Sequence, residues 1–355
     1  MNRLAAVLAA LAFVFAAHAG AAAAGPFLVN VTYDAVDALP GDGSCDDGTG
    51  NCTLRAAVME ANAWAGWDDI DVPGGVFQLT LGGGLDVHSG MGISGKGPRR
   101  TIVDGLNVQR VFDLRSASAS ISGVMIRGGR EKDGAGIRAE LSKLQLRWDD
   151  LWVDNAAYGG GIAAYDSALV LSGVTFVDDT STYLGGAMYL AASSPGAGYA
   201  ELENVTLHGN ASRRGGGIFA NDVPVVLRND TIANNSAALG GGVYALGVVP
   251  AAYNTIVAYN GGQDCANPLA SIANNEDTDA TCGFFGANDL PGVDPFLAGL
   301  AYLGGPIPTP NWVRPLLPWS PAIDRGDPAT CAAVDERGQP RPVGPACDIG
   351  AYEAP

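Results

Sequence analysis

The sequence is poor in basic residues and in charge of either sign. Its 355 residues include 20 Lys and Arg against 37 Asp and Glu, which gives a formal net charge of −17, and only three of the basic residues are lysines. Nucleic acid and anionic membrane surfaces are poor partners for such a chain, because phosphate binding needs clustered positive charge. Charged residues make up 16% of the chain and apolar residues 47%. That balance excludes a disordered tail, which would be less apolar, and a coiled coil, which would contain more Glu and Lys.

No apolar run is long enough to span a membrane. The run Leu4–Ala17 has 14 residues, about 21 Å as a helix, whereas a bilayer core is roughly 30 Å thick. It follows Arg3 and precedes small-residue cleavage motifs at 17–19 and 22–24, a pattern typical of a secretory signal peptide. We therefore expect a signal peptide over residues 1–24, no membrane insertion, and a mature protein that is extracellular, at the cell surface or periplasmic.

Metal-binding cysteine motifs are absent. No C-x-x-C occurs and only two histidines follow the signal, so a zinc site is not expected. All six cysteines also follow the signal, and six cysteines allow fifteen pairings. We favour the local pairing, because each pair then flanks a polar, turn-rich loop outside the repetitive middle of the chain. The expected disulfides are Cys45–Cys52, Cys265–Cys282 and Cys331–Cys347.

Glycine, in contrast, is abundant, with 50 residues, and much of it recurs in a fixed pattern. A glycine-rich run followed by an aliphatic residue repeats along the chain, and successive aliphatic residues are 25, 26, 30 and 25 positions apart. These residues are Ile137, Ile162, Met188, Ile218 and Val243. A second unit, found at Leu171–Phe176, Leu202–Leu207 and Leu227–Ile232, keeps a similar period. Two patterns with one period indicate a repeat architecture.

Each repeat is predicted to form short β-strands. Apolar residues alternate with polar ones over short stretches, and no helix-length amphipathic run appears between residues 70 and 260. Helical repeats are thereby excluded, and propeller blades would need about 40 residues. About 25 residues suit three strands and three turns per coil, with each coil hydrogen-bonded to the next. We predict an all-β fold, a single parallel β-helix over residues 70–290, with one continuous interior file formed by Ile162, Met188, Ile218 and Val243.

The segments that flank the repeats differ from them. Thr53 has the side chain of a helix N-cap, and apolar residues follow it at helical spacing. These are Leu54, Ala57, Val58 and Ala61. We expect residues 25–69 to supply a strand and a helix that covers the first coil. Residues 291–355 are rich in proline and lose the glycine repeat, which predicts a loop-rich C-terminal cap tied by a disulfide.

Both flanking segments resemble parts of secreted bacterial right-handed β-helix proteins. Cys52–Val58 is similar to the C-S-L-R-E-A-I box that opens many of them, although Ala56 replaces a residue that is usually acidic or an amide. Ser320–Asp327, Asp335–Pro342 and Cys347–Glu353 resemble the choice-of-anchor domain that closes them. The central repeats resemble pectate-lyase-like and polymorphic outer-membrane-protein repeats. The resemblance implies a right-handed β-helix at the cell exterior, and it implies no particular reaction.

One set of charged residues could serve a polysaccharide lyase. β-Elimination needs a Lys or Arg base near carboxylates that can hold calcium. Lys132, Arg138 and Asp154 lie in a stretch rich in both charges, residues 127–154. The simpler interpretation is solvated surface charge, because charged residues are usually exposed.

A second set could serve a glycoside hydrolase. Hydrolysis needs two carboxylates on one face, and Asp178 and Asp179 are adjacent. These two residues also align with Asn234 and Asn235 of another coil. The simpler interpretation is a ladder of turn residues that satisfies backbone groups.

Aromatic residues favour binding over catalysis. In the strands that follow three of the glycine runs, alternation turns Tyr189, Phe219 and Tyr244 outward. Rings one coil apart can stack on sugar faces, and the acidic surface favours neutral or cationic glycans over uronates. The same rings could instead only stabilise the sheet, as cross-strand aromatic pairs do.

Two acidic clusters could hold calcium, although acidic loops are more often only solvated. They are Asp42, Asp46 and Asp47, and Glu276, Asp277 and Asp279. No other cofactor is indicated. A file of threonines, expected to face solvent, consists of Thr175, Thr206, Thr231 and Thr255.

We conclude from the sequence that the chain is an exported, non-catalytic, adhesin-like β-helix protein. Its expected partner is a polysaccharide, a cell-surface glycan or another cell-surface component. A polysaccharide lyase or glycoside hydrolase on the same scaffold is the alternative, and a structural component of the envelope is a second one.

Overall fold

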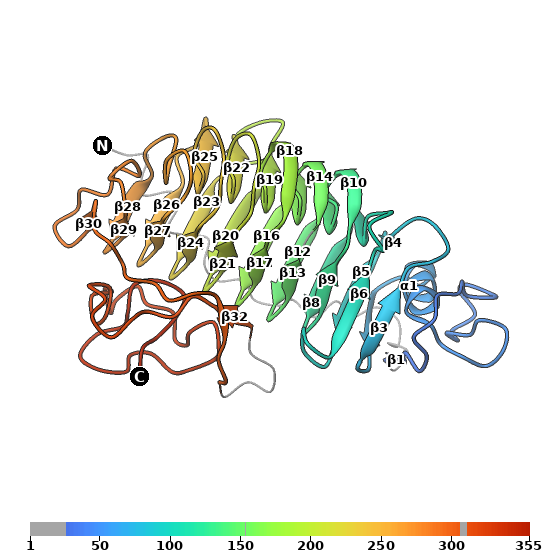
Figure 1. Cartoon of the computed structure of the whole chain (residues 1–355). Helices are drawn as coiled ribbons and strands as arrows, with labels where there is room; N and C mark the ends of the chain where they lie inside the picture. The colour runs from blue at the N-terminus through green and yellow to red at the C-terminus, as the bar shows by residue number, and fades with distance from the viewer. Residues whose placement is uncertain (1–25, 153, 306–310) are drawn as a thin grey trace.

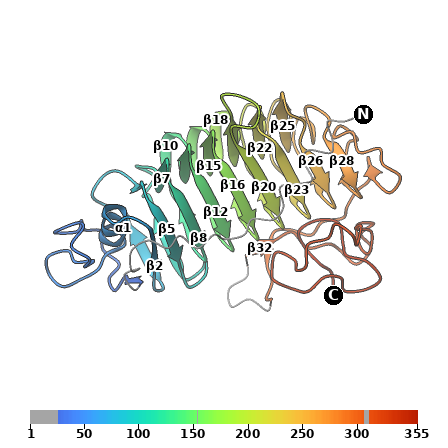
Figure 2. The same ribbon diagram turned by 180° about the vertical axis from the view of Figure 1, so that it is seen from behind.

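Most of the chain forms a parallel β-helix, in which coils of similar length stack along one axis (Figures 1 and 2). The structure is a computed structural model that describes residues 26–152, 154–305 and 311–355. The expected signal peptide, residues 1–24, lies outside the described residues. Neighbouring coils pair in parallel with equivalent residues in register, so that Met188 pairs with Ile162 on one side and Ile218 on the other.

Sheets A and B each run along the stack with ten strands. Sheet A consists of β1 (Phe27–Leu28), β2 (Trp67–Asp71), β5 (Gly90–Ser94), β8 (Ser118–Ser122), β12 (Lys143–Arg147), β16 (Ala168–Ser172), β20 (Tyr199–Glu203), β23 (Val225–Arg228), β26 (Ala251–Tyr253) and β28 (Ala270–Ala273). Sheet B consists of β3 (Gly75–Gln78), β6 (Thr101–Asp104), β9 (Met125–Arg127), β13 (Asp150–Trp152), β17 (Thr175–Val177), β21 (Thr206–His208), β24 (Thr231–Ala233), β27 (Ile256–Ala258), β29 (Glu276–Asp277) and β30 (Leu290–Pro291).

Two further sheets complete the coils. Sheet C has seven strands: β4 (Leu85–Val87), β7 (Phe112–Arg115), β11 (Ile137–Glu140), β15 (Ile162–Tyr165), β19 (Met188–Ala191), β22 (Ile218–Asn221) and β25 (Val243–Leu246). Sheet D has three strands: β10 (Arg130–Asp133), β14 (Asn155–Tyr158) and β18 (Thr180–Leu184). In the middle coils the chain passes from sheet A to sheet B, then to sheet D and sheet C.

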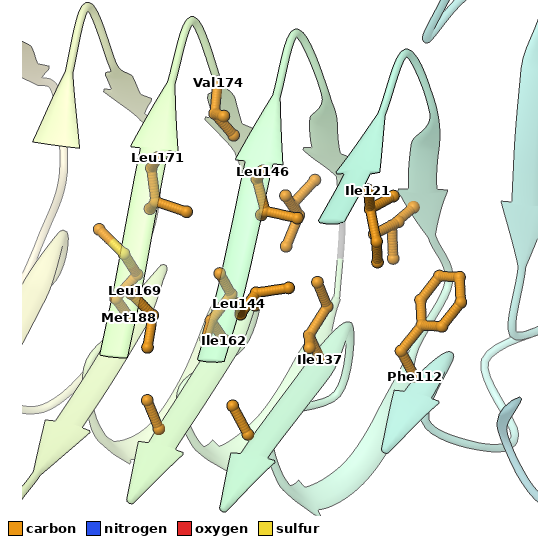
Figure 3. Packing of buried hydrophobic residues seen from close by; sticks show 14 of the residues in the cluster. Phe112, Ile121, Ile137, Leu144, Leu146, Ile162, Leu169, Leu171, Val174 and Met188 are labelled. Carbon is orange, nitrogen blue, oxygen red and sulfur yellow. The ribbon is translucent and has the colours of Figure 1, made fainter. Parts of the chain in front are cut away.

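The interior is filled by files of aliphatic side chains, as the repeat predicted. Ile162, Met188, Ile218 and Val243 are buried and pair across β15, β19, β22 and β25. Figure 3 shows this file continuing through Ile137 to Phe112, opposite the file formed by Ile121, Leu146 and Leu171. Because each coil adds one apolar residue to each file, a single core runs through the stack.

The helix α1 (Leu54–Ala63) covers the first coils, as expected (Figure 1). Thr53 caps it, since the Thr53 Oγ1 accepts a hydrogen bond from the Ala56 N–H at 3.0 Å. The apolar residues at helical spacing, Leu54, Ala57, Val58 and Ala61, are all buried. In the part of the chain that the structure describes, no helix combines the length and the apolar character needed to cross a bilayer.

The C-terminal segment, described over residues 292–305 and 311–355, is rich in loops and lies along the outer face of sheet B (Figure 1). Its two short strands, β31 (Ala301–Tyr302) and β32 (Trp312–Val313), pair antiparallel. The prediction was a cap over the end of the stack, whereas much of the described segment lies along its side. The Asn311 amide, for example, donates to the carbonyl oxygens of Asp149 and Gly173.

This placement buries the threonine file, so the expectation that it faces solvent is wrong. The Thr175 hydroxyl donates to the Trp312 carbonyl at 2.8 Å and to Glu336 at 3.0 Å, and the Thr206 hydroxyl also donates to Glu336. Thr231 accepts from the Ala351 N–H at 3.0 Å. Thr255 does not belong to the file, because Ile256 pairs with Thr231.

The six cysteines form three disulfides in the structure. They are Cys45–Cys52, Cys265–Cys282 and Cys331–Cys347, the local pairing favoured from the sequence. Cys45–Cys52 and Cys331–Cys347 close loops in the two flanking segments, whereas Cys265–Cys282 encloses β28 and β29 of the stack.

Candidate functional site

Six aromatic side chains gather on the outer side of sheets C and D. We call this surface the aromatic face, and it consists of Tyr158, Tyr165, Tyr183, Tyr189, Phe219 and Tyr244. Neighbouring ring centroids lie 5.4 to 5.7 Å apart. Rings at this separation are in contact, so the six side chains form one continuous surface over several coils.

Strand register explains half of the aromatic face. Tyr189, Phe219 and Tyr244 occupy equivalent positions in β19, β22 and β25. Their strand neighbours, such as Ile218 and Ala220, belong to the interior cluster, so alternation turns the rings outward as predicted. The Tyr189 and Phe219 rings are stacked, with an interplanar angle of 15°, whereas the Tyr244 ring meets Phe219 edge-on at 89°.

The burial of Phe219 contradicts the prediction that all three rings, Tyr189, Phe219 and Tyr244, are available to a ligand. Its side chain is only 4% exposed, because its neighbours cover it, although it points away from the interior. Tyr189 and Tyr244 are half-buried, and Tyr183 is the most open ring, at 47% exposure. Phe219 therefore supports the aromatic face from below, and the tyrosines present its accessible surface.

Tyr158, Tyr165 and Tyr183 were not among the site residues predicted from the sequence. Tyr158 and Tyr183 lie in β14 and β18 of sheet D, and both rings contact others of the aromatic face. The signal that could have found Tyr158 and Tyr183 is their spacing of one coil period, although a register shift pairs Tyr158 with Leu184 in the structure. Their strands were not predicted as a separate sheet, so their common orientation was not apparent.

Polar groups border the aromatic face. Burial, together with the charge of the nearby Asp133 carboxylate, raises the pKa of Tyr165. Burial also raises the pKa of Tyr189, with contributions from Tyr158 and Asp133. Both hydroxyls stay protonated at neutral pH and can donate hydrogen bonds. A carboxylate beside protonated tyrosines offers acceptors and donors to the hydroxyl groups of a sugar.

A network of ion pairs lies next to the aromatic face, on the outer side of sheet C. Asp113 accepts from Arg110 at 2.9 Å, Arg115 at 2.8 Å and Arg138 at 2.9 Å. Burial alone would raise the pKa of Asp113, but the hydrogen bond from Arg115 and the charges of Arg110 and Arg138 bring that pKa below its usual value. Arg138 also pairs with Glu140 at 3.1 Å, so its guanidinium is held by two carboxylates.

The structure does not bring the lyase candidates together. Residues 127–154 make about one turn of the helix, so their side chains are distributed around its perimeter. Lys132 lies on sheet D and Arg138 on sheet C, whereas Asp154 follows sheet B and is fully buried. The Asp154 carboxylate accepts from the Gly129 N–H at 2.5 Å. Asp154 therefore cannot reach a substrate beside Lys132 or Arg138.

The hydrolase candidates are also separated, although they are adjacent in sequence. Asp178 is exposed at a corner with a φ of 56°, and Asp179 is fully buried. The main-chain N–H of Asp179 donates to the Asn210 side chain at 2.9 Å, and that of Asn210 donates to Asn235 at 3.0 Å. This is the ladder of turn residues that the alignment with Asn234 and Asn235 indicated. The two carboxylates cannot face one substrate.

The first calcium candidates cap their own turns. Asp42 accepts from the Ser44 N–H at 2.8 Å, and Asp46 accepts from two glycine N–H groups. Asp47 binds Thr49 and Tyr33, and these hydrogen bonds lower the pKa of Asp47 to about 2. Main-chain and hydroxyl donors therefore occupy these carboxylates.

The second calcium candidates point in different directions. Glu276 and Asp277 are consecutive residues of β29 and both are fully buried, whereas Asp279 is exposed. Burial raises the pKa of Glu276 to about 8 and that of Asp277 to about 6. Within the described residues, no group of three or more His, Cys, Asp or Glu side chains is arranged to hold a metal ion.

Comparisons with known proteins add little to these observations. No family model matches the chain, and no curated protein matches it. Among solved structures, the chain is similar to the crystal structure of pectate lyase Pel9A, with a TM-score of 0.38 and 13% sequence identity over 91% of this chain and 96% of that chain. The assignment of a parallel β-helix rests on the strand pairing within this chain.

Proposed function

We propose that the protein is an exported, non-catalytic β-helix protein that binds glycan through the aromatic face. The observation that carries this proposal is the continuous set of contacting rings over sheets C and D, with Tyr183 almost half exposed. Flat aromatic surfaces suit the apolar faces of sugar rings, and the bordering polar groups suit their hydroxyls. Three disulfides support export, because disulfides persist in oxidising compartments.

The net charge of the chain limits the kinds of glycan that we expect the aromatic face to bind. With a net charge of −17, the protein repels polyuronates and other anionic chains at low ionic strength. Asp133 beside Tyr165 adds a local negative charge at the aromatic face. The expected ligand is a neutral or cationic glycan that extends across several coils.

The experiment is a glycan array with the mature protein, followed by calorimetry on the glycans that bind. We compare the wild type with a Tyr158→Ala, Tyr183→Ala double variant. Because each lost stacking contact is worth about 1 kcal/mol, the double variant should bind at least about tenfold more weakly. Trp319→Ala removes a ring that is 65% exposed on the C-terminal segment, and it should leave binding unchanged.

Activity assays with the same glycans distinguish a binding protein from a lyase or a hydrolase. An absorbance assay for unsaturated product and a reducing-end assay should both show no turnover. Turnover by either assay would establish a lyase or a hydrolase instead. Binding that is equal in the wild type and the double variant would exclude the aromatic face, and an array with no bound glycan would favour a structural component of the envelope.

A further inference from the structure

A cleft opens on the outer face of sheet B, beside the C-terminal segment. Its volume is about 480 Å³, and it is lined by Asp104, Asn107, Met125, Arg127, Gly128 and Trp152. Asp104, Arg127 and Trp152 occupy one register position on the adjacent strands β6, β9 and β13. Three successive coils therefore contribute a carboxylate, a guanidinium and an indole to one concave surface.

The indole of Trp152 is held in place by the C-terminal segment. Trp312 meets it edge-on, with ring centroids 5.4 Å apart and an interplanar angle of 86°. Trp312 is fixed in turn, because its carbonyl accepts from the Thr175 hydroxyl at 2.8 Å and its ring contacts Tyr302. One wall of the cleft is thus a preorganised aromatic surface, to which Met125 adds further apolar contact.

The opposite side of the cleft is polar but electrically balanced. Arg127 pairs with Asp104 at 2.9 Å, and the Arg127 side chain remains 41% exposed. Asp104 is only 8% exposed and also accepts from the Leu106 N–H at 2.8 Å. The pair uses Nε and Nη2 of the guanidinium, so Nη1 is directed elsewhere. The cleft offers hydrogen-bond donors and acceptors without a net charge that would select an ion.

The backbone that presents Asn107 is strained. Leu106 and Asn107 have φ values of 61° and 57°, in the left-handed region that Asn tolerates and Leu rarely adopts. The Asn107 N–H donates to the Gly128 carbonyl at 2.6 Å, which ties this turn to the floor of the cleft. Conformational strain of this kind persists where the surrounding structure enforces it, and it occurs often at binding sites.

We propose that this cleft binds one neutral sugar ring, such as the end of a glycan chain. The volume lies within the range of about 300–1,000 Å³ that is typical of small-molecule sites. Trp152 and Met125 suit the apolar face of a pyranose, whereas Asp104, Asn107 and Arg127 suit its hydroxyls. This site is independent of the aromatic face, because it lies on another sheet and shares no residue with it.

The test uses saturation-transfer NMR with named probes. These are the methyl glycosides of glucose, galactose, mannose and N-acetylglucosamine, with galacturonic acid as the anionic comparison. We expect at least one neutral glycoside to bind and to weaken by about tenfold or more in Trp152→Ala. Because Trp152→Ala could disturb the packing of Trp312, Asn107→Gly is the second variant. It removes the amide while glycine keeps the left-handed backbone, and it should weaken binding several-fold.

Each outcome is decisive. Binding that weakens in both cleft variants but not in the Tyr158→Ala, Tyr183→Ala variant supports the proposal, whether or not the aromatic face binds glycan. Binding that weakens only in the tyrosine variant assigns the probes to the aromatic face and overturns the proposal. Absence of binding by every probe at millimolar concentration, or a preference for galacturonic acid, also overturns it.

Discussion

The main-chain N–H of Asp154 donates a hydrogen bond of 2.9 Å to the carboxyl Oδ1 of Asp179, one coil further along the stack. The same contact repeats from Asp179 to Asn210, from Asn210 to Asn235 and from Asn235 to Asn260. The asparagines also donate, since Asn235 Nδ2 reaches the Leu207 carbonyl at 3.0 Å. An ionised aspartate cannot donate, and among the described residues Oδ2 of Asp154 and of Asp179 is buried without a partner. These two positions of the ladder therefore favour a neutral side chain.

The ladder predicts that Asp179→Asn stabilises the protein at neutral pH. Burial raises the pKa of Asp179, and burial with the nearby Asp179 charge raises that of Asp154. A raised pKa means that the unfolded chain ionises first, so the stability of the wild type falls as the pH rises above about 4 towards the raised value. The variant lacks this loss. We expect it to be about 1–3 kcal/mol more stable at pH 8 and nearly equal at pH 3, as measured by urea unfolding.

The reciprocal change provides the control for the ladder. Asn210→Asp introduces a carboxyl at a fully buried position. In the wild type, the Asn210 side chain accepts a hydrogen bond from the Asp179 N–H and donates one to the Phe176 carbonyl. The substitution should destabilise the protein at pH 8 and much less at pH 3. Equal losses of stability at the two pH values would show that the buried carboxyl introduced at position 210 is ionised in the folded protein at pH 8.

Phe219 and Tyr183 should differ sharply in their effects on stability. Phe219→Ala removes a buried ring and should cost about 3–5 kcal/mol. Tyr183→Ala removes a ring that is nearly half exposed and should cost about 1 kcal/mol or less. Thermal unfolding of both variants measures this difference. Similar losses would contradict the division of the aromatic face into a supporting ring and accessible rings.

Gly186→Ala should destabilise the stack strongly. A Cβ atom at Gly186 would clash with the Gly216 carbonyl of the next coil and would lie 2.6 Å from the Ala211 nitrogen. Coils held together by backbone hydrogen bonds cannot separate locally without breaking them, so we expect a cost of at least about 3 kcal/mol. Gly299→Ala is the matched control, because nothing lies within 4 Å of the added atom. Soluble expression and the urea midpoint distinguish the two.

Thr206→Val should loosen the C-terminal segment. The Thr206 hydroxyl donates to the fully buried Glu336, and valine keeps the shape but removes the donor. Leaving a buried carboxyl oxygen without this bond should cost about 1–3 kcal/mol and increase proteolysis of the segment. Thr49→Val removes a similar but solvent-exposed bond to Asp47 and should cost less than about 1 kcal/mol. Equal costs would mean that Glu336 does not help to hold the segment.

The residue pattern was sufficient to predict the features of the structure that depend on the repeat period. The file formed by Ile162, Met188, Ile218 and Val243 and the alignment of Asp179 with Asn235 followed from spacing, because equivalent residues of stacked coils must be neighbours. The spacing also gave the outward direction of Tyr189 and Tyr244. Spacing alone could not decide whether the lyase candidates converge, because residues that are close within one coil point to different sides of it.

The sequence by itself determined the β-helix, its capping helix and its interior files, since these follow from a local alternation repeated at a constant period. Only the tertiary structure decided which outer surfaces are open. Asn311 bonds to Asp149, and Glu336 to Thr206, across separations of 162 and 130 residues. Repeat spacing carries no information about such contacts, because every outward position of a coil has the same alternation whether solvent or another segment covers it. The docking of the C-terminal segment buries the threonine file and places Trp312 against Trp152, which lines the cleft.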